Sequence, residues 1–402
     1  MNKGKKDVIV LSRNYSTGLG VIRSLGSAGY NVDLVSSTKK KGSSSLITCS
    51  RFVRTSVEVQ SEIIQGDPGD DLVEALLELR KHNEDKAVLF PTDDFTAAVV
   101  LSHKEILKEY FLMPDVLENS RWTFEEIMDK SVQEKLAKES GLLTPEQWTV
   151  SLEENIYIPD DMIYPCFVKP LQSISGRKSE MAKCNSREEL ENHLSEMKKF
   201  YSHRSVLVQE YLDIEQEYDL SGVCSDQNVV IPGVIKKTKI ASFERGVTMS
   251  GKMEPVEAIS EIRDSVDRFL KSIHYTGMFD MELNFSKGRF YFNEINLRSG
   301  GPSYFYYLCG INLPALAVQA VSGKWTETEI SLETGKTFVY EKVCWEDYIH
   351  GYINRKEKNR IISGADYRLI KNEDDPLPGK AFHSRIRLSF LKNRLKKILG
   401  KS

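Results

Sequence analysis

Apolar runs alternate with amphipathic stretches along the first hundred residues. Residues 7–12 (DVIVLS) have the composition of a buried strand, residues 18–30 supply a Gly-rich turn and a helix, and residues 31–36 (NVDLVS) give a second strand. A further strand within residues 86–94 (KAVLFPTDD) ends in polar residues and precedes another helix. This order predicts an α/β domain with a parallel sheet over residues 1–118.

The middle of the chain has a different pattern. Residues 124–141 form an amphipathic helix that stops at Gly141, and strand-like runs follow with helices between them. We therefore expect an α+β domain over residues 119–330, with a small lid subdomain at about 130–208. Residues 331–402 are expected to form a C-terminal extension that ends in a basic amphipathic segment.

Residues 281–297 alternate apolar and polar side chains in a pattern that predicts a β-hairpin with its turn at 286–288. Since side chains alternate across a strand, residues of equal parity lie on the same face. Apolar odd-numbered residues then pack on one face. The polar residues at even positions share the other face: Glu282, Glu294, Asn296 and Arg298. Phe290 and Phe292 break the alternation, so the pattern leaves the strand register open.

Composition narrows the class of protein. The 402 residues carry a formal net charge of −3, with 28% charged and 40% hydrophobic residues, which suits a globular protein of about two or three domains. This balance gives no reason to expect nucleic-acid binding. Six scattered cysteines without a CxxC pair are typical of reduced thiols. The first apolar run is too short for a signal peptide, and no stretch is long enough to span a membrane, so we expect a cytoplasmic protein.

The Gly-rich turn after the first strand raises the question of a dinucleotide site. The fingerprint G-x-G-x-x-G needs a small third residue for close helix packing, but Gly18 and Gly20 are followed by Arg23. The second strand also ends without a well-placed acidic residue. The sequence therefore favours a tight turn in a domain without nicotinamide or flavin, and disfavours an oxidoreductase.

The hairpin carries the ligands that a divalent cation needs. Glu282, Glu294 and Asn296 offer carboxylate and amide oxygens, which Mg²⁺ prefers and completes with water and phosphate oxygens; Mn²⁺ is the alternative ion. Arg298 would place a permanent cation beside the bound anion. For these residues alone, the competing interpretation is a solvated polar face with a local salt bridge.

Residues upstream of the hairpin have the chemistry of a nucleotide site. Lys169 lies in an apolar strand just before a proline, and Lys130 lies on the helix before it. A lone strand lysine could also extend into solvent. The loop that follows is rich in Ser and Gly and can offer N–H and hydroxyl groups to phosphate oxygens, from Ser173, Ser175 and Gly176.

The adenosine end of a nucleotide has a candidate site in the next strand. It runs into Gln209, Glu210, Tyr211 and Leu212, whose backbone carbonyl and amide groups can read adenine. Glu217 follows and can accept hydrogen bonds from ribose hydroxyls.

In this order, the motifs resemble the ATP-grasp superfamily. The series is a helix lysine (Lys130), a strand lysine (Lys169), a phosphate loop, a Q-E-Y-L hinge, a ribose acid (Glu217) and an E…E-x-N-x-R hairpin. Residues 50–52 (SRF) and 90–95 (FPTDDF) and the tail sequence DDPLPGKAF extend the likeness. The nearest group is that of the bacterial carboxylate–amine ligases, including D-aspartate ligases. The phosphate loop is poorer in glycine than in many relatives.

The resemblance implies an ADP-forming ligase that uses ATP and Mg²⁺. Such an enzyme activates a small-molecule carboxylate as an acyl phosphate and couples it to an amine; an amino acid or an envelope or capsule precursor are the expected substrate classes. Lys130 and Lys169 would neutralise phosphate oxygens, and Arg298 would stabilise the acyl phosphate. A catalytically inactive ATP-binding module stays open as the alternative, and a homodimer is one open option for the assembly.

Four further residues have two interpretations each. Lys237 and Lys239 lie in one strand and either contact phosphate or substrate, Lys237 then as a catalytic residue, or are exposed on an edge strand. Thr92 and Asp93 follow a parallel strand and either face the substrate or cap the next helix, with the cap slightly favoured.

The last residues, 384–402, contain seven basic residues and no acidic one, with apolar residues at helical spacing. A helix of this kind either docks on the protein with a solvated basic face or lies on an anionic membrane. In the second case the protein would associate with the inner membrane surface.

Overall fold

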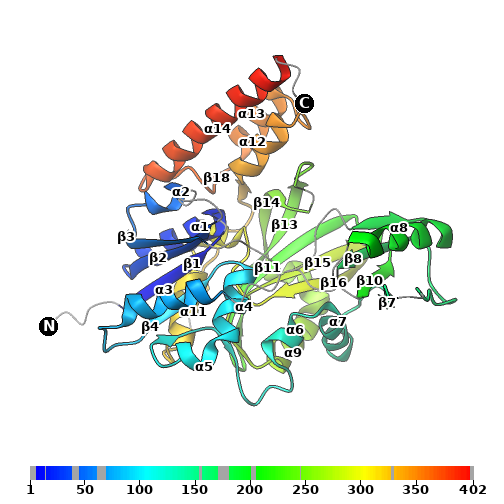
Figure 1. Cartoon of the computed structure of the whole chain (residues 1–402), viewed down its shortest axis with the longest axis horizontal. Coiled ribbons are helices and arrows are strands. Elements are labelled where there is room, and N and C mark those ends of the chain that lie inside the picture. The colour runs from blue at the N-terminus through cyan, green and yellow to red at the C-terminus, as the bar shows by residue number, and fades with distance from the viewer. Residues whose placement is uncertain are drawn as a thin grey trace.

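A parallel sheet forms the N-terminal part of the molecule, as the sequence predicted. Its strand order is β3-β2-β1-β4-β5, and each neighbouring pair runs parallel. Helices cover both faces, so the four central residues of β1 are apolar: Val8 and Val10 pack toward α1, and Ile9 and Leu11 pack toward α3 and α4 (Figure 1). The computed structural model describes residues 6–13, 15–38, 45–60, 69–153, 156–170, 181–200, 205–244, 246–326 and 330–398.

Three of these strands and two of the helices were predicted from the sequence: β1, α1 and β2 at the start of the chain, and β4 followed by α4. The strands are β1 (Asp7–Ser12), β2 (Asn31–Thr38), β3 (Val53–Gln60), β4 (Ala87–Pro91) and β5 (Phe111–Leu112). The helices are α1 (Tyr15–Ser27), α2 (Ser45–Thr48), α3 (Asp70–Arg80), α4 (Asp94–Ser102) and α5 (Lys104–Leu107).

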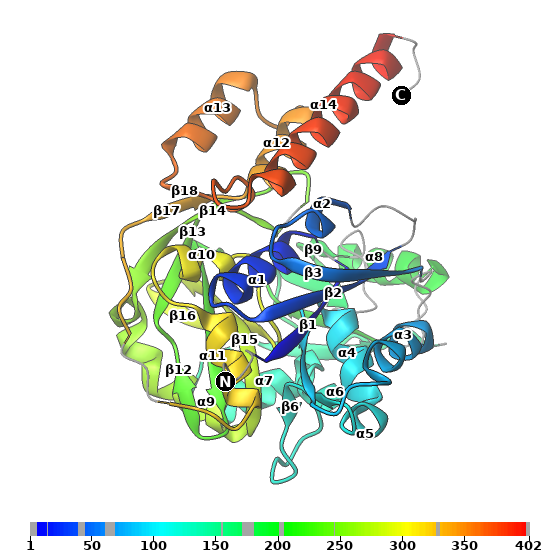
Figure 2. The same ribbon diagram turned by 90° about the vertical axis from the view of Figure 1, so that its left-hand side faces the viewer.

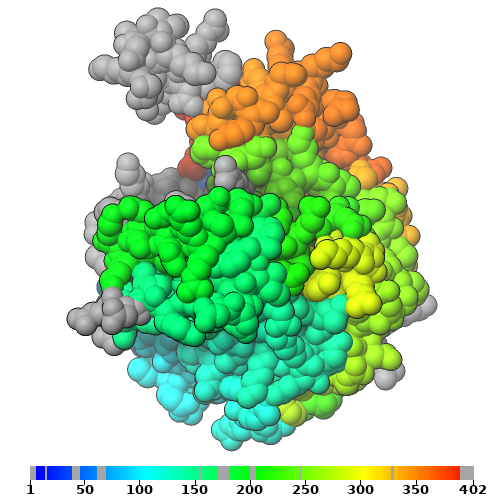
Figure 3. All heavy atoms as spheres, turned by 90° about the vertical axis from the view of Figure 1, so that its right-hand side faces the viewer, coloured from blue at the N-terminus to red at the C-terminus, as the bar shows by residue number. Residues whose placement is uncertain are grey.

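A small antiparallel sheet has a hydrophobic core of its own. Its strands have the order β7-β10-β8-β9, and α8 packs on it through Leu190, Leu194 and Met197. In the space-filling view, this green region lies on one face of the molecule, beneath the orange C-terminal helices (Figure 3). It overlaps the lid subdomain proposed at about 130–208. The elements are β7 (Gln147–Ser151), β8 (Cys166–Pro170), β9 (Ala182–Cys184), α8 (Arg187–Phe200) and β10 (Ser205–Glu210).

A large sheet forms the centre of the molecule, with strand order β16-β15-β11-β13-β14-β17-β18; β12 pairs with β11 and β6 with β15. One face packs on α7 and α9, and the other packs on α10 and α11, which also contact α1. The strands are β6 (Asp115–Val116), β11 (Gln216–Ser225), β12 (Asn228–Val230), β13 (Gly233–Ile240), β14 (Thr248–Pro255), β15 (Tyr275–Ser286), β16 (Arg289–Asn296), β17 (Thr337–Val339) and β18 (Tyr367–Arg368).

The helices around this sheet are short, apart from the last one. They are α6 (Phe124–Ile127), α7 (Lys130–Glu139), the 3₁₀ helix η2 (Val256–Ile262), α9 (Arg263–Ser272), α10 (Ser303–Leu308), α11 (Leu313–Val321), α12 (Glu341–Ile349), α13 (Arg355–Gly364) and α14 (Pro376–Ile398). Within the described residues, no helix combines the length and the apolar character needed to cross a bilayer.

The predicted hairpin is β15–β16, and a bulge explains its broken alternation. Lys287 and Gly288 both have positive φ angles, which suits a tight two-residue turn. Leu283 pairs with Phe292, but Glu282 pairs with Glu294, so Asn293 is an extra residue on β16. This insertion reverses the parity. The core side of β16 is therefore Phe290 and Phe292 before the bulge and Ile295 after it.

The C-terminal extension continues the large sheet. Strand β17 pairs with β14 in antiparallel orientation, and β18 pairs with β17 in parallel orientation. Helix α14 contacts α2 of the N-terminal part and then runs outward from the body (Figure 2). We keep the division into 1–118, 119–330 and 331–402 as a proposal.

Candidate active site

The hairpin brings the predicted acidic residues face to face. Glu282 on β15 lies directly opposite Glu294 on β16, and Asp280 lies opposite Asn296. On the neighbouring strand β11, Asp219 lies opposite Glu282. The sheet therefore places a row of carboxylate and amide oxygens across three adjacent strands. Two of these acidic residues, Asp219 and Asp280, were not among the residues predicted from the hairpin sequence.

Lys130 reaches this row from the first turn of α7. Its Nζ lies 3.1 Å from Oε2 of Glu294, and the lysine is buried. Gln133, one turn later, fixes the helix on the strand: its Nε2 donates to the carbonyl of Ile295, and its Oε1 accepts from the amide of Ile295. This contact places the amine of Lys130 at the hairpin.

Lys169 approaches from the small sheet, on β8, and is 6% exposed. Burial, assisted by Lys130, lowers the pKa of Lys169 to about 7. Burial opposes ionisation of Glu294, but Lys130 and Lys169 outweigh it and lower the pKa of Glu294 to about 2. The two lysines and the hairpin carboxylate therefore form one electrostatic unit, although they come from three different elements.

A cavity of about 360 Å³ joins these groups to the hinge after β10. The structure places eight of the predicted site residues in its wall: Lys130, Lys169, Gln209, Tyr211, Leu212, Glu217, Glu282 and Glu294. Among the described lining residues, Glu210 is absent. The predicted phosphate-loop residues Ser173, Ser175 and Gly176 lie outside the described residues.

The hinge leaves polar atoms open for a ligand. The amides of Glu210 and Tyr211 donate to the carbonyls of Glu146 and Pro165. Within the described part of the chain, the amide of Leu212 meets no acceptor, and the buried Oε1 of Gln209 has no hydrogen-bond partner. A buried polar atom without a partner is costly, so the wall is suited to a ligand that supplies one donor and one acceptor.

Lys237 is a buried ion-pair centre, which excludes the edge-strand interpretation. Strand β13 lies between β11 and β14, and the amine contacts Asp219 at 2.9 Å and both Glu217 and Glu282 at 3.3 Å. Burial alone would lower the pKa of Lys237, but the three carboxylates raise it well above its ordinary value. The lysine holds the ribose-acid and metal-ligand candidates together.

A second cavity of about 180 Å³ adjoins the first and shares Gly246, Glu282 and Glu294 with it. Asn296 and Arg298 line this second cavity. They share its wall with Asp219, Asp280, Thr248 and Thr17. Polar side chains from the sheet therefore line a second space directly beside the first cavity.

Arg298 is held in the second cavity by the N-terminal part of the chain. Its Nε donates to Oδ1 of Asp94 at 2.7 Å, and its Nη1 lies 4.0 Å from Oδ2 of Asp280. The sequence analysis singled out Thr92 and Asp93 in this segment, but the neighbouring Asp94 makes the contact. A signal was present, because two aspartates follow the strand and only one can cap the helix.

Asp93 and Thr92 have structural partners. Asp93 caps α4 through the amide of Thr96 and also accepts from the amide of Arg13, which agrees with the helix-cap interpretation. The hydroxyl of Thr92 donates to the carbonyl of Leu11. Lys239 pairs with Glu357 on α13 and is partly exposed, away from both cavities.

Burial shifts the acidic groups of the sheet together. It raises the pKa of Glu282 to about 7 and the pKa values of Asp219 and Asp280 to about 6, against the opposing charges of Lys237 and Arg298. These carboxyl groups thus lie close to one another in a region of negative potential. Their crowding favours the binding of a cation.

The donor set fits Mg²⁺. The described residues hold no cluster of three or more Asp, Glu, His or Cys side chains at metal-binding distance. However, Mg²⁺ is usually bound by one or two carboxylates, with water and substrate phosphates as its other ligands. Glu282 and Glu294 provide two carboxylates with side chains 26% and 21% exposed, and Asn296 adds an amide oxygen.

Comparison with known proteins agrees with this geometry. The family model described as the ATP-grasp domain matches residues 135–301, the segment that contains Lys169, the hinge and the hairpin. The chain contains an ATP-grasp domain. The predicted ATP-grasp fold is thereby confirmed.

Curated relatives of this chain include the carbamoyl phosphate synthase large chain of Halomonas eurihalina. The two are 26% identical over 217 residues, which cover 52% of this chain and 19% of the relative. A second such large chain, from Pseudomonas putida, is 25% identical over 201 residues, which are 49% of this chain and 18% of the relative. The match thus spans about a fifth of these relatives.

Solved structures share the fold over most of the chain. An L-amino acid ligase from Bacillus licheniformis superposes with a TM-score of 0.58 and 17% identity, covering 84% of this chain and 79% of that one. N5-carboxyaminoimidazole synthetase from Staphylococcus aureus superposes with a TM-score of 0.61 and 15% identity, covering 88% of this chain and 88% of that one. A third structure is the biotin carboxylase domain of the Hydrogenobacter thermophilus 2-oxoglutarate carboxylase, solved with MgADP and bicarbonate. It superposes with a TM-score of 0.63 and 17% identity, covering 84% of this chain and 74% of that one.

Proposed function

We propose that this ATP-grasp protein is an ADP-forming ligase that activates a small-molecule carboxylate as an acyl phosphate and couples it to an amine. The observation that carries the proposal is the contact of Lys130 with Glu294, opposite Glu282, in a cavity that also contains Lys169. A second cavity with Arg298 adjoins it. The arrangement provides a nucleotide site and a substrate site with a shared wall.

ATP would occupy the first cavity. The Oε1 of Gln209 and the amide of Leu212 provide an acceptor and a donor for adenine, and Glu217 accepts from the ribose. Lys130 and Lys169 neutralise phosphate oxygens, together with the loop residues Ser173, Ser175 and Gly176 predicted from the sequence. Glu282, Glu294 and Asn296 would hold Mg²⁺, or Mn²⁺ in its place, and the ion would neutralise charge on the β- and γ-phosphates.

The substrate carboxylate would react at the boundary of the two cavities. A carboxylate oxygen attacks the γ-phosphorus, the bond from the γ-phosphorus to the β,γ-bridging oxygen breaks, and ADP leaves. The amine then attacks the acyl carbon, inorganic phosphate leaves, and the amine nitrogen loses a proton. Arg298 stabilises the negative charge that develops on the acyl phosphate and on the tetrahedral species. Lys237 acts on the reaction by fixing Glu217 and Glu282.

The relatives and the lining of the second cavity support an inference about the substrate class. An L-amino acid ligase is among the proteins with this fold. The sequence motifs also resemble those of the carboxylate–amine ligases, which include the D-aspartate ligase group. We infer an amino acid, or an envelope or capsule precursor, as one of the two substrates. The large acidic component of the second cavity, with Asp219 and Asp280, favours an amine that enters as an ammonium ion.

A panel assay tests the proposal. Purified protein is incubated with ATP, Mg²⁺ and pairs of amino acids, sugar acids and amines, and ADP and condensed products are measured. We expect ADP release that requires Mg²⁺ and both partners, with a product mass equal to acid plus amine minus water. ATP binding without turnover across the panel would favour the inactive binding module, and ADP release driven by bicarbonate alone would favour a carboxylase.

Membrane association is a separate proposal, carried by α14. Leu377 and Leu388 are 52% and 59% exposed and lie three helical turns apart, so they share a face. The sequence continues this spacing with Leu391 and Leu395 between basic residues. We propose that the helix attaches an otherwise cytoplasmic enzyme to an anionic inner membrane surface. A homodimer remains the proposed assembly.

A further inference from the structure

We propose that the C-terminal extension (331–402) is part of the substrate site and controls which acid or amine the enzyme accepts. The inference rests on the proposed ligase function, and it assigns substrate selection to a region outside the matched ATP-grasp segment, 135–301. Three observations carry it: the extension lines the second cavity, it is bonded to the N-terminal part of the chain through a buried ion pair, and it contacts the loop that borders both cavities.

The extension lines the second cavity directly. Phe338, Tyr340 and Leu369 are all buried and lie in its wall. They reach it because β17 pairs with β14, whose first residue, Thr248, lies in the same wall. The wall thus combines aromatic and aliphatic side chains from the extension with polar side chains from the ATP-grasp domain and from α1.

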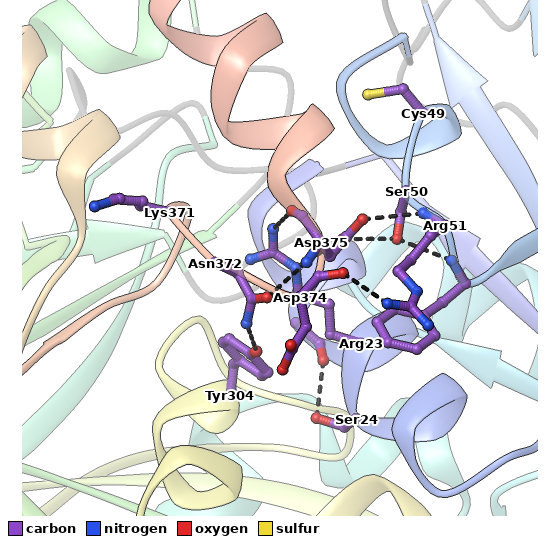
Figure 4. Close-up of polar contacts among 12 residues, drawn as sticks. Arg23, Ser24, Cys49, Ser50, Arg51, Tyr304, Lys371, Asn372, Asp374 and Asp375 are labelled. Atoms are coloured by element: carbon purple, nitrogen blue, oxygen red, sulfur yellow. Dashed lines mark hydrogen bonds and ion pairs between the residues drawn. The ribbon is translucent and has the colours of Figure 1, made fainter.

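A buried ion pair locks this wall to the N-terminal part of the molecule. Arg23 on α1 donates from Nε to Oδ2 of Asp375 at 3.0 Å, and both side chains are 1% exposed (Figure 4). The same guanidinium donates to the carbonyl of Leu369 at 3.1 Å. Arg23 therefore connects Asp375 with Leu369, which is a residue of the cavity wall.

The lock also uses the SRF segment. Asp375 accepts from the hydroxyl of Ser50 at 2.8 Å and from the amide of Arg51 at 3.0 Å (Figure 4). Asn372 adds a hydrogen bond to the hydroxyl of Tyr304 on α10. Two of the three sequence motifs that resembled ligases outside the ATP-grasp domain, SRF and DDPLPGKAF, thus meet at one contact. Arg23, which disfavours a dinucleotide fingerprint, has its use here.

On the other side of the cavity, the extension holds the loop between β13 and β14. Asp347 on α12 is fully buried and accepts from the amides of Ser242 and Phe243 at 2.9 and 2.8 Å. The ring of Phe243 stacks on His350, with centroids 3.7 Å apart. Further along this loop, Gly246 lies in the wall of both cavities.

The two attachments have different consequences. The Arg23–Asp375 lock positions Leu369, which contacts the second cavity alone. The Asp347 contact positions a loop that borders both cavities. Loosening the first should weaken substrate binding without changing ATP binding, whereas loosening the second should weaken both. A purely structural role of the extension would give no such division.

The test compares Asp375→Asn with Asp374→Asn. Both changes remove one carboxylate from adjacent positions, but the side chain of Asp374 is exposed. We expect Asp375→Asn to raise the KM for the acid or the amine by about tenfold or more, because small displacements at a site have large effects, with the KM for ATP within about twofold of wild type. Asp347→Asn should raise the KM of both substrate and ATP, and Asp374→Asn should match wild type.

Leu369→Phe covers the case in which Asp375→Asn does not fold. It enlarges a wall side chain without touching the ion pair, and it should change the relative kcat/KM values within a panel of acids and amines while preserving the KM for ATP. Unchanged substrate KM values and preferences in the folded Asp375 and Leu369 variants would overturn the inference and leave the ligase function intact. Absence of turnover by the wild-type enzyme would instead overturn the proposed function, and the inference with it.

Discussion

Arg298 of the hairpin region donates a hydrogen bond to Asp94 at the start of α4, at 2.7 Å, across 204 residues of sequence. The contact connects the ATP-grasp domain with the carboxyl end of β4 in the N-terminal sheet, where ligands of parallel sheets are commonly bound. It orients the guanidinium at the second cavity. The N-terminal part of the chain therefore positions a charged side chain of the proposed substrate site.

Replacing the guanidinium group of Arg298 should lower the reaction rate without weakening nucleotide binding. Because a lysine cannot make the same directed hydrogen bonds, Arg298→Lys is expected to lower kcat by about 10²–10³, with the Kd for ATP within a few-fold of wild type. Asp94→Asn should have a smaller effect in the same direction. Arg289→Lys, at an exposed position of β16, is the matched control. Equal losses in ATP affinity and kcat would contradict this role.

Glu294→Gln should raise the Mg²⁺ requirement and reduce ADP release by about 100-fold or more, because it removes one of the two carboxylates proposed for the ion. The variant also leaves Lys130 without its partner at 3.1 Å. Mg²⁺ titrations of ADP release measure the effect. Glu257→Gln, at an exposed position of the 3₁₀ helix, is the control. An unchanged Mg²⁺ dependence in Glu294→Gln would rule out the ligand role.

Lys169→Met should stabilise the ligand-free protein although it abolishes turnover. Burial and Lys130 lower the pKa of Lys169 from 10.5 to about 7, so the folded state holds an unfavourable charge below pH 7. Between about pH 7 and 10.5 the unfolded state binds more protons, and wild-type stability rises with pH through this term. The variant lacks that term, so its advantage is largest at and below pH 7.

Thermal denaturation without nucleotide checks this prediction. The Tm of Lys169→Met should exceed that of wild type by about 2 °C or more near pH 6.5, and the difference should shrink near pH 9. Lys199→Met, at an exposed position on α8, should behave like wild type. A difference that grows with rising pH would show that Lys169 is not held in a desolvating site.

The membrane proposal for α14 predicts a dependence on lipid charge. Replacing Arg387, Lys392, Arg394 and Lys396 with glutamine removes positive charges worth about 1 kcal/mol each at an anionic surface, so binding should fall by about 10²-fold or more. Sedimentation with anionic and with neutral vesicles measures it. Equal sedimentation of wild type and variant with anionic vesicles would show that the helix has another role.

Local patterns were sufficient to predict the parallel sheet of the N-terminal part and the acidic face of the hairpin. In both cases the signal is short-range: an apolar run flanked by helices, or residues of equal parity on one strand. The same argument from alternating side chains could have identified Asp280, which lies two residues before Glu282. It could also have identified Asp219, which lies opposite Glu282 on the neighbouring strand. These residues lacked a motif to draw attention to them.

Other features depend on contacts that the sequence does not encode locally. The bulge at Asn293 follows from the packing of Phe290 and Phe292 in the core. The sequence shows only that the alternation of apolar and polar residues is broken there, which leaves the strand register undetermined. The choice between Asp93 and Asp94 depends on the direction of one helix turn. The attachment of the tail depends on the pairing of Arg23 with Asp375, 352 residues apart.

Isotope transfer from the substrate carboxylate tests the central claim most directly. Once a substrate pair is found, the acid is supplied with ¹⁸O in its carboxyl group, and the released phosphate is analysed by mass spectrometry. Activation as an acyl phosphate predicts one ¹⁸O atom in each phosphate and ADP equal to the amide formed. Unlabelled phosphate accompanying amide formation, or release of AMP and pyrophosphate, would contradict the account.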